Sequence, residues 1–83
     1  MSTSLNQLNE ELQQKISDYE STLDFIQNEL IQDRGKLARA KHQSQPKEVI
    51  DLILDDIEKL EKGIDQYQEW LAIFRKQLQT NED

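Results

Sequence analysis

The sequence predicts an all-α protein: a long antiparallel helical hairpin, similar to a coiled coil, in a single domain that covers residues 1–83. Three observations predict this fold. Apolar residues recur at heptad spacing in two long stretches, the only proline lies between these stretches, and glycine occurs at just two positions. Because glycine and proline are the residues that most often interrupt helices, each stretch can remain helical throughout.

The first helix is expected to cover about residues 4 to 42. Ser4 is expected to cap its N-terminus, with Gln7 three residues later as the capping-box partner. We call the a and d positions of the heptads the seam, because an antiparallel partner helix packs against them. With Ile16 placed at a, the seam of this helix consists of Leu5, Asn9, Leu12, Ile16, Tyr19, Leu23, Ile26, Leu30, Asp33, Leu37 and Ala40.

Asp33 is the one charged residue in this mostly apolar seam. Its carboxylate is expected to reach toward Lys36 or to lie at a loosened tip beside Gly35. The alternative is that Asp33 fixes the register of the two helices, as single polar residues do in other coiled coils.

The second helix is expected to cover about residues 46 to 79, followed by a frayed tail at residues 80–83. Pro46 suits the first helical position, N1, because the N–H that proline lacks would have no partner there. Every seam position of this helix is apolar, which is a strong coiled-coil signal. These positions are Ile50, Ile53, Ile57, Leu60, Ile64, Tyr67, Leu71, Phe74 and Leu78.

The two seams match when the chain folds back on itself. In an antiparallel pair each a position faces a d position, and residues whose numbers add up to 90 satisfy this rule. The centre of that register is residue 45, inside the segment HQSQP, so the turn is expected at about residues 43–45. The expected pairs are Leu12 with Leu78, Ile16 with Phe74, Tyr19 with Leu71, Leu23 with Tyr67, Ile26 with Ile64, Leu30 with Leu60, Leu37 with Ile53, and Ala40 with Ile50, while Asp33 faces Ile57.

Large apolar residues also lie outside the seam. On the second helix, Val49 and Leu52 lie near the turn and Trp70 and Ile73 near the termini, all at c or g positions, and Phe25 lies at c on the first helix. A stripe wider than the seam is typical of a helix that packs against two neighbours, so these five residues are the predicted interface of a homodimer or with a partner protein. Two hairpins would form an antiparallel four-helix bundle with two-fold symmetry. Three further off-seam residues are Leu8, Ile31 and Leu54.

Gly63 is unusual, because a glycine inside a helix costs ~1 kcal/mol relative to alanine. Its g position, one heptad before Trp70, would let another helix approach closely or give the indole ring space. A neutral surface glycine is the equally weighted alternative.

A basic segment precedes and includes the start of the second helix. Residues 34–47 contain no Asp or Glu, although the chain has a net charge of -7. The helix dipole favours cations at a helix C-terminus, and in an antiparallel dimer this positive end would meet the acidic end of the other copy. An acidic protein, RNA or anionic lipid is the alternative partner, but no aromatic residue for base stacking lies between 26 and 66. We call Arg34, Lys36, Arg39, Lys41 and Lys47 the basic tip.

The plan of a dimerising helical hairpin of this length resembles the Rop class of small RNA-regulatory proteins. It is also similar to the helical-hairpin subunits and co-chaperones of type III secretion systems. The resemblance concerns length and topology, and it assigns no functional residue in this chain. It implies two alternative functions: an RNA-binding regulator that uses the basic tip, or a secretion co-chaperone or subunit that binds a partner helix.

The residue types present argue against catalysis and against a cofactor or metal site. The chain has no cysteine, and its single histidine, His42, is expected to be an exposed turn residue. No nucleophile and base recur in a catalytic pattern, and no signal peptide or membrane span is apparent. We therefore expect a cytoplasmic, acidic, non-catalytic protein that acts as a protein–protein interaction, regulatory or adaptor module.

Overall fold

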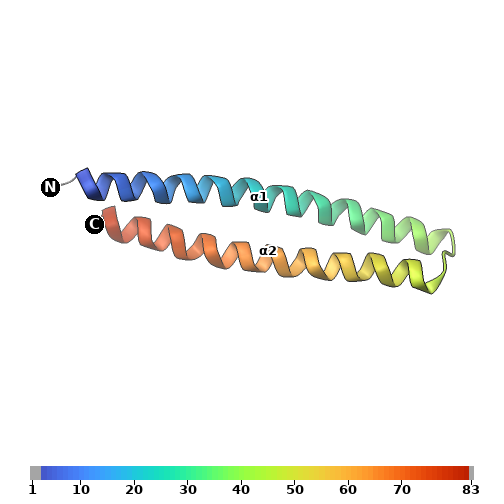
Figure 1. The fold of residues 1–83 in the computed structure, drawn as a ribbon. Coiled ribbons are helices and arrows are strands. Elements are labelled where there is room, and N and C mark those ends of the chain that lie inside the picture. The colour runs from blue at the N-terminus through green and yellow to red at the C-terminus, as the bar shows by residue number, and fades with distance from the viewer. Residues whose placement is uncertain (1–2, 83) are drawn as a thin grey trace.

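The protein is a two-helix antiparallel hairpin, as the sequence predicts (Figure 1). The computed structural model describes residues 3–82, with side chains from Leu5 to Asn81. Helix α1 spans Thr3–His42 and helix α2 spans Lys47–Glu82, and the described termini lie together at the end opposite the turn. The rod measures 65 × 15 × 14 Å. The predicted cap at Ser4 falls outside the described side chains.

The core of the hairpin is the predicted seam. The buried apolar residues all occupy a or d positions, and Leu71 is the most deeply buried, with 2% of its surface exposed. The ring of Tyr19, which the register places opposite Leu71, lies 5.2 Å from the ring of Tyr67 and 5.1 Å from that of Phe74. These distances agree with a register centred on residue 45. The buried apolar residues are Leu12, Leu30, Ala40, Ile57 and Leu71.

Helix α1 ends in a Schellman motif, a C-terminal cap closed by two backbone hydrogen bonds. The N–H of Gln45 donates to the carbonyl of Ala40 over 2.9 Å, and the N–H of Ser44 donates to that of Lys41 over 3.1 Å. Such a cap needs one residue in the left-handed region, and Ser44 fills this position with a φ of 54°. A proline shortly after the cap, here Pro46, prevents the helix from continuing.

Replacing Ser44 with glycine is expected to stabilise the hairpin. A side chain in the left-handed region costs about 1–2 kcal/mol, which glycine avoids while losing more backbone entropy on folding. The expected net gain is therefore about 0.5–1 kcal/mol. Urea unfolding followed by circular dichroism measures it, with Ser44→Ala as the control that keeps the strain and should show no gain.

Helix α2 begins and ends differently from the prediction. The carbonyl of Pro46 accepts the first helical hydrogen bonds, from the N–H groups of Val49 and Ile50. Pro46 is therefore the N-cap residue and not the first helical residue, N1, as the sequence predicted. At the other end the helix continues to Glu82, beyond residue 79, where the sequence analysis placed a frayed tail. No glycine or proline stops it there, and the Thr80 hydroxyl donates to the carbonyl of Lys76 over 2.9 Å inside the last turns.

Asp33 lies in the seam, where only 9% of its surface is exposed. Its carboxylate forms an ion pair with the Lys36 ammonium over 3.6 Å, which agrees with one of the two preferred predictions. The other, a loosened tip beside Gly35, is wrong, because α1 remains helical through Gly35 and ends in the ordered cap at Ser44. The register pairs Asp33 with the buried Ile57, and Asp33 also lines a shallow depression beside Lys36 and Lys59.

Candidate functional site

Four large apolar side chains lie exposed along one side of α2. They occupy c and g positions, and between 38% and 68% of the surface of each is exposed. An exposed set of this kind, at heptad spacing on one helix, indicates an interaction surface rather than scattered surface residues. We call Val49, Leu52, Trp70 and Ile73 the α2 face.

The half of the α2 face near the termini rests on a cluster of aromatic rings. The Trp70 ring lies 5.8 Å from that of Tyr19 and 5.3 Å from that of Tyr67, edge to face in both cases. The Lys15 ammonium lies 5.8 Å from the centre of the Phe74 ring. Edge-to-face packing of this kind restrains the rings, so Trp70 is held in place while 38% of its surface stays open to a partner.

Gly63 lies between the two halves of the α2 face. A Cβ added there would meet only the Ile26 Cδ1, at 3.9 Å, which is an ordinary van der Waals contact. The hairpin therefore has room for alanine at this position and does not itself require glycine. Because glycine inside a helix costs ~1 kcal/mol relative to alanine, alanine at position 63 would make a single hairpin more stable.

Phe25, the fifth predicted interface residue, lies on α1. It occupies a c position, and 65% of its surface is exposed. In the heptad assignment the polar g positions Thr22 and Glu29 lie between it and α2, and its place in an interface stays a prediction.

The basic tip is partly neutralised by the shaft. Arg34 pairs with Glu61 across the hairpin over 3.3 Å, and Lys36 pairs with Asp33. Among the residues that the structure describes, Arg39, Lys41 and Lys47 form no ion pair, and all three are exposed. The free positive charge of the turn end therefore comes from these three side chains and not from all five.

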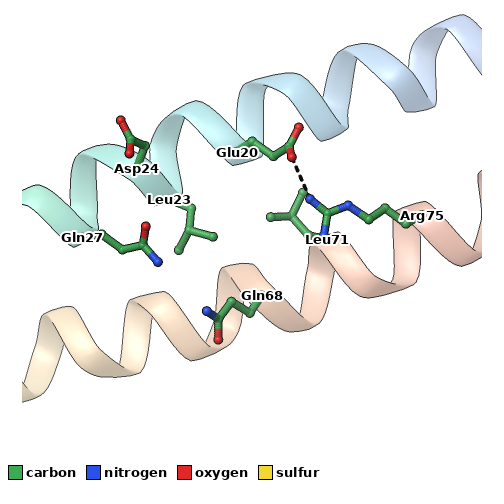
Figure 2. Close-up of a pocket in the computed structure, with 7 residues that line it drawn as sticks. All are labelled: Glu20, Leu23, Asp24, Gln27, Gln68, Leu71 and Arg75. Carbon is green, nitrogen blue, oxygen red and sulfur yellow. Dashed lines mark hydrogen bonds and ion pairs between the residues drawn. The ribbon is translucent and has the colours of Figure 1, made fainter.

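The opposite side of the hairpin carries a polar groove (Figure 2). Arg75 pairs with Glu20 across its end over 2.7 Å, and Leu23 and Leu71 lie between the two helices. Asp24, Gln27 and Gln68 complete its lining, and its volume is about 320 Å³. The groove holds carboxylates, amides and one guanidinium, none of which is a nucleophile paired with a base.

Sequence reasoning missed the acidic partners of the two arginines, Glu20 and Glu61. Both pairs join e positions whose numbers add up to 95, Glu20 with Arg75 and Arg34 with Glu61. The register centred on residue 45 places e positions side by side across an antiparallel seam. The same heptad assignment would therefore have found them.

The described part of the chain lacks two kinds of feature. No group of three or more acidic or histidine side chains within residues 3–82 is arranged to hold a metal ion. Neither α1 nor α2, over the same residues, has the length and apolar character needed to cross a membrane.

Comparisons of this chain with protein-family models, curated proteins and solved structures found no match.

Proposed function

We propose that the protein is a non-catalytic interaction module, acting as an adaptor or regulator, whose working form is a homodimeric four-helix bundle. The single observation that carries the proposal is the α2 face. Trp70 and Ile73 near the termini, and Val49 and Leu52 near the turn, are the kind of large apolar side chains that form the centres of protein interfaces.

The amount of exposed surface supports the same proposal. The hairpin exposes 6347 Å², whereas a compact monomer of 9.8 kDa exposes about 5,200 Å² by the usual scaling of surface with mass. The elongated shape accounts for the difference. An interface of standard size buries about 800 Å² per partner, so association along one side of the rod would leave about 5,500 Å² exposed on each chain, near the value for a compact monomer.

The charge distribution gives the dimer something to display. The basic tip holds five of the ten Lys and Arg residues, which leaves five bases against all 17 acids on the rest of the chain. A partner protein would therefore meet an acidic shaft with positive ends, and its association would weaken as salt rises.

Light scattering over a range of concentrations tests the dimer. The expected mass is about 20 kDa, twice the 9.8 kDa of one chain. Leu52→Glu is expected to yield monomers, because it places two charges in the proposed interface. Ile31→Glu is the matched control: both parent side chains are highly exposed, 68% and 66%, but Ile31 lies on α1 away from the α2 face. A single-chain mass for the unmodified protein at every concentration would refute the homodimer and assign the α2 face to a different protein.

RNA binding is a second candidate function, supported by the exposed cations Arg39, Lys41 and Lys47. If it holds, Arg39→Gln together with Lys41→Gln should weaken binding to RNA and reduce the steepness of its salt dependence. Equal binding by the variant and the unmodified protein would exclude this role for the tip.

A further inference from the structure

We infer that the second copy docks its α2 against α2 in antiparallel orientation, with the two-fold axis beside residue 61. The inference rests on the proposed homodimer and adds the orientation and register of its interface. In this arrangement the α2 face of one copy packs against the α2 face of the other.

The c and g positions of α2 can pair between two copies with this symmetry. Its g and c positions alternate at spacings of three and four residues, as a and d positions do. In an antiparallel pair each g position then faces a c position of the other copy when the two numbers add up to 122. Leu52 faces Trp70 of the second copy, and Val49 faces its Ile73. The two-fold axis repeats both contacts, so each end of the interface holds four of the exposed apolar side chains.

The centre of this register explains the glycine. Gly63 faces Lys59 of the second copy, and because Gly63 has no side chain, the aliphatic stem of that lysine can lie close to the helix. Lys59 keeps its ammonium toward solvent, where it pairs with Asp55 of its own helix over 3.3 Å. Space for a Cβ already exists inside the hairpin at Gly63. A close approach by the second copy therefore gives a packing reason for glycine at position 63, whereas the single hairpin gives none.

A depression beside Ile73 fits the same register. It has a volume of about 290 Å³ and is lined by residues of the last turns of α2. The register places Val49 of the second copy opposite Ile73, which borders this depression. An apolar residue near the start of one α2 thus meets a hollow near the end of the other. The lining residues are Ile73, Lys76, Gln77, Thr80 and Asn81.

Charge disfavours the parallel alternative, and the distribution of apolar residues favours α2 over α1. A parallel pair would set Asp56 against Asp56 and Lys59 against Lys59 along the interface, and it would bring two basic tips together. The antiparallel pair sets Asp56 against Gln66 and places the tips at opposite ends. On α1, the corresponding c and g positions are mostly charged or polar, and Leu8 and Phe25 are the large apolar residues among them, so the exposed apolar side chains are concentrated on α2.

Spin-label distances test the orientation directly. The chain has no cysteine, so Lys62→Cys and Gln79→Cys each carry one label, at exposed positions outside the α2 face. Because a helix rises 1.5 Å per residue, equivalent residues in the antiparallel dimer separate by about 3 Å for each residue of distance from the axis. Labels at position 79 should therefore lie about 54 Å apart along the rod, whereas labels at position 62 should lie within about 25 Å.

The outcomes separate the two proposals. Labelled protein with the mass of a single chain and no dipolar signal would defeat the homodimer itself. A dimer with short distances at both positions, or with the longer distance at position 62, would leave the homodimer standing and overturn the antiparallel docking.

The glycine provides a second measurement. Gly63→Leu should raise the dimer dissociation constant by about tenfold or more, because two added side chains meet at the centre of the interface. Gly35→Leu is the matched control on α1, where a Cβ would meet only the flexible Arg39 guanidinium, at 3.4 Å, and it should leave the constant unchanged. Equal constants for Gly63→Leu and the unmodified protein would overturn the close approach at Gly63 and with it this register.

Discussion

Replacing Leu71 with alanine is expected to lower the free energy of unfolding by about 2–5 kcal/mol, the range found when a buried leucine is truncated in a packed core. Leu71 is 2% exposed and lies in the seam beside Tyr19. Alanine has the higher helix propensity, so the loss would come from packing and not from the helix. Urea unfolding at one fixed protein concentration measures it, since the stability of an associating protein depends on its concentration.

Ile31→Ala is the control for this truncation. The Ile31 side chain is 66% exposed on α1, and surface substitutions of this kind usually change stability by less than about 0.5 kcal/mol. Similar losses for the two variants would mean that the seam is not the core of the hairpin.

The fold could be predicted because each part of it depends on a short-range pattern. The apolar seam of residues 50–78 identifies α2 without reference to any other part of the chain. Its match to the first seam fixes the register, and the same register places the turn at HQSQP. Three signals that agree on one arrangement are what a sequence with a single preferred fold is expected to show.

The details of the turn and of the C-terminus could not be predicted in this way. A Schellman motif is usually marked by glycine, and here Ser44 takes the left-handed position, so its sequence signal is missing. Pro46 is compatible with both N1 and the N-cap position, and only the hydrogen bonds of its carbonyl distinguish them. The end of α2 was placed too early because the polar residues after Leu78 resemble a frayed tail, although none of them stops a helix.

The exposure of the α2 face could be predicted from the sequence, but its shape could not. The heptad letters alone place Val49, Leu52, Trp70 and Ile73 outside the seam, and all four are exposed. They give no information on the support of Trp70 by neighbouring rings, or on the depression beside Ile73, because both depend on side-chain conformations across the hairpin. The separation of Phe25 from this group follows from the polar residues between them, which the letters contain but an inventory of apolar residues overlooks.

Replacing Asp33 with leucine is expected to raise the free energy of unfolding by about 1–3 kcal/mol, because exchanging a buried charge for a packed apolar side chain is often stabilising. Asp33 is 9% exposed, and the register pairs it with Ile57, which is 8% exposed, so leucine would add an apolar side chain to the seam. The lost ion pair is a small term, since the Lys36 side chain is 59% exposed and keeps its hydration.

Asp33→Asn separates the two effects that this change combines. Asparagine has nearly the same shape and removes the charge, but it leaves a polar group in the seam without the ion pair to Lys36. It should therefore be no more stable than the unmodified protein. A loss of stability in Asp33→Leu would contradict the argument and show that the carboxylate stabilises the hairpin. A different outcome is a gain in stability together with several distances, in place of one, between a spin label on α1 and a spin label on α2 of the same chain. That result would assign Asp33 the role of fixing the register of the two helices, because a buried polar residue can lower stability while excluding alternative alignments.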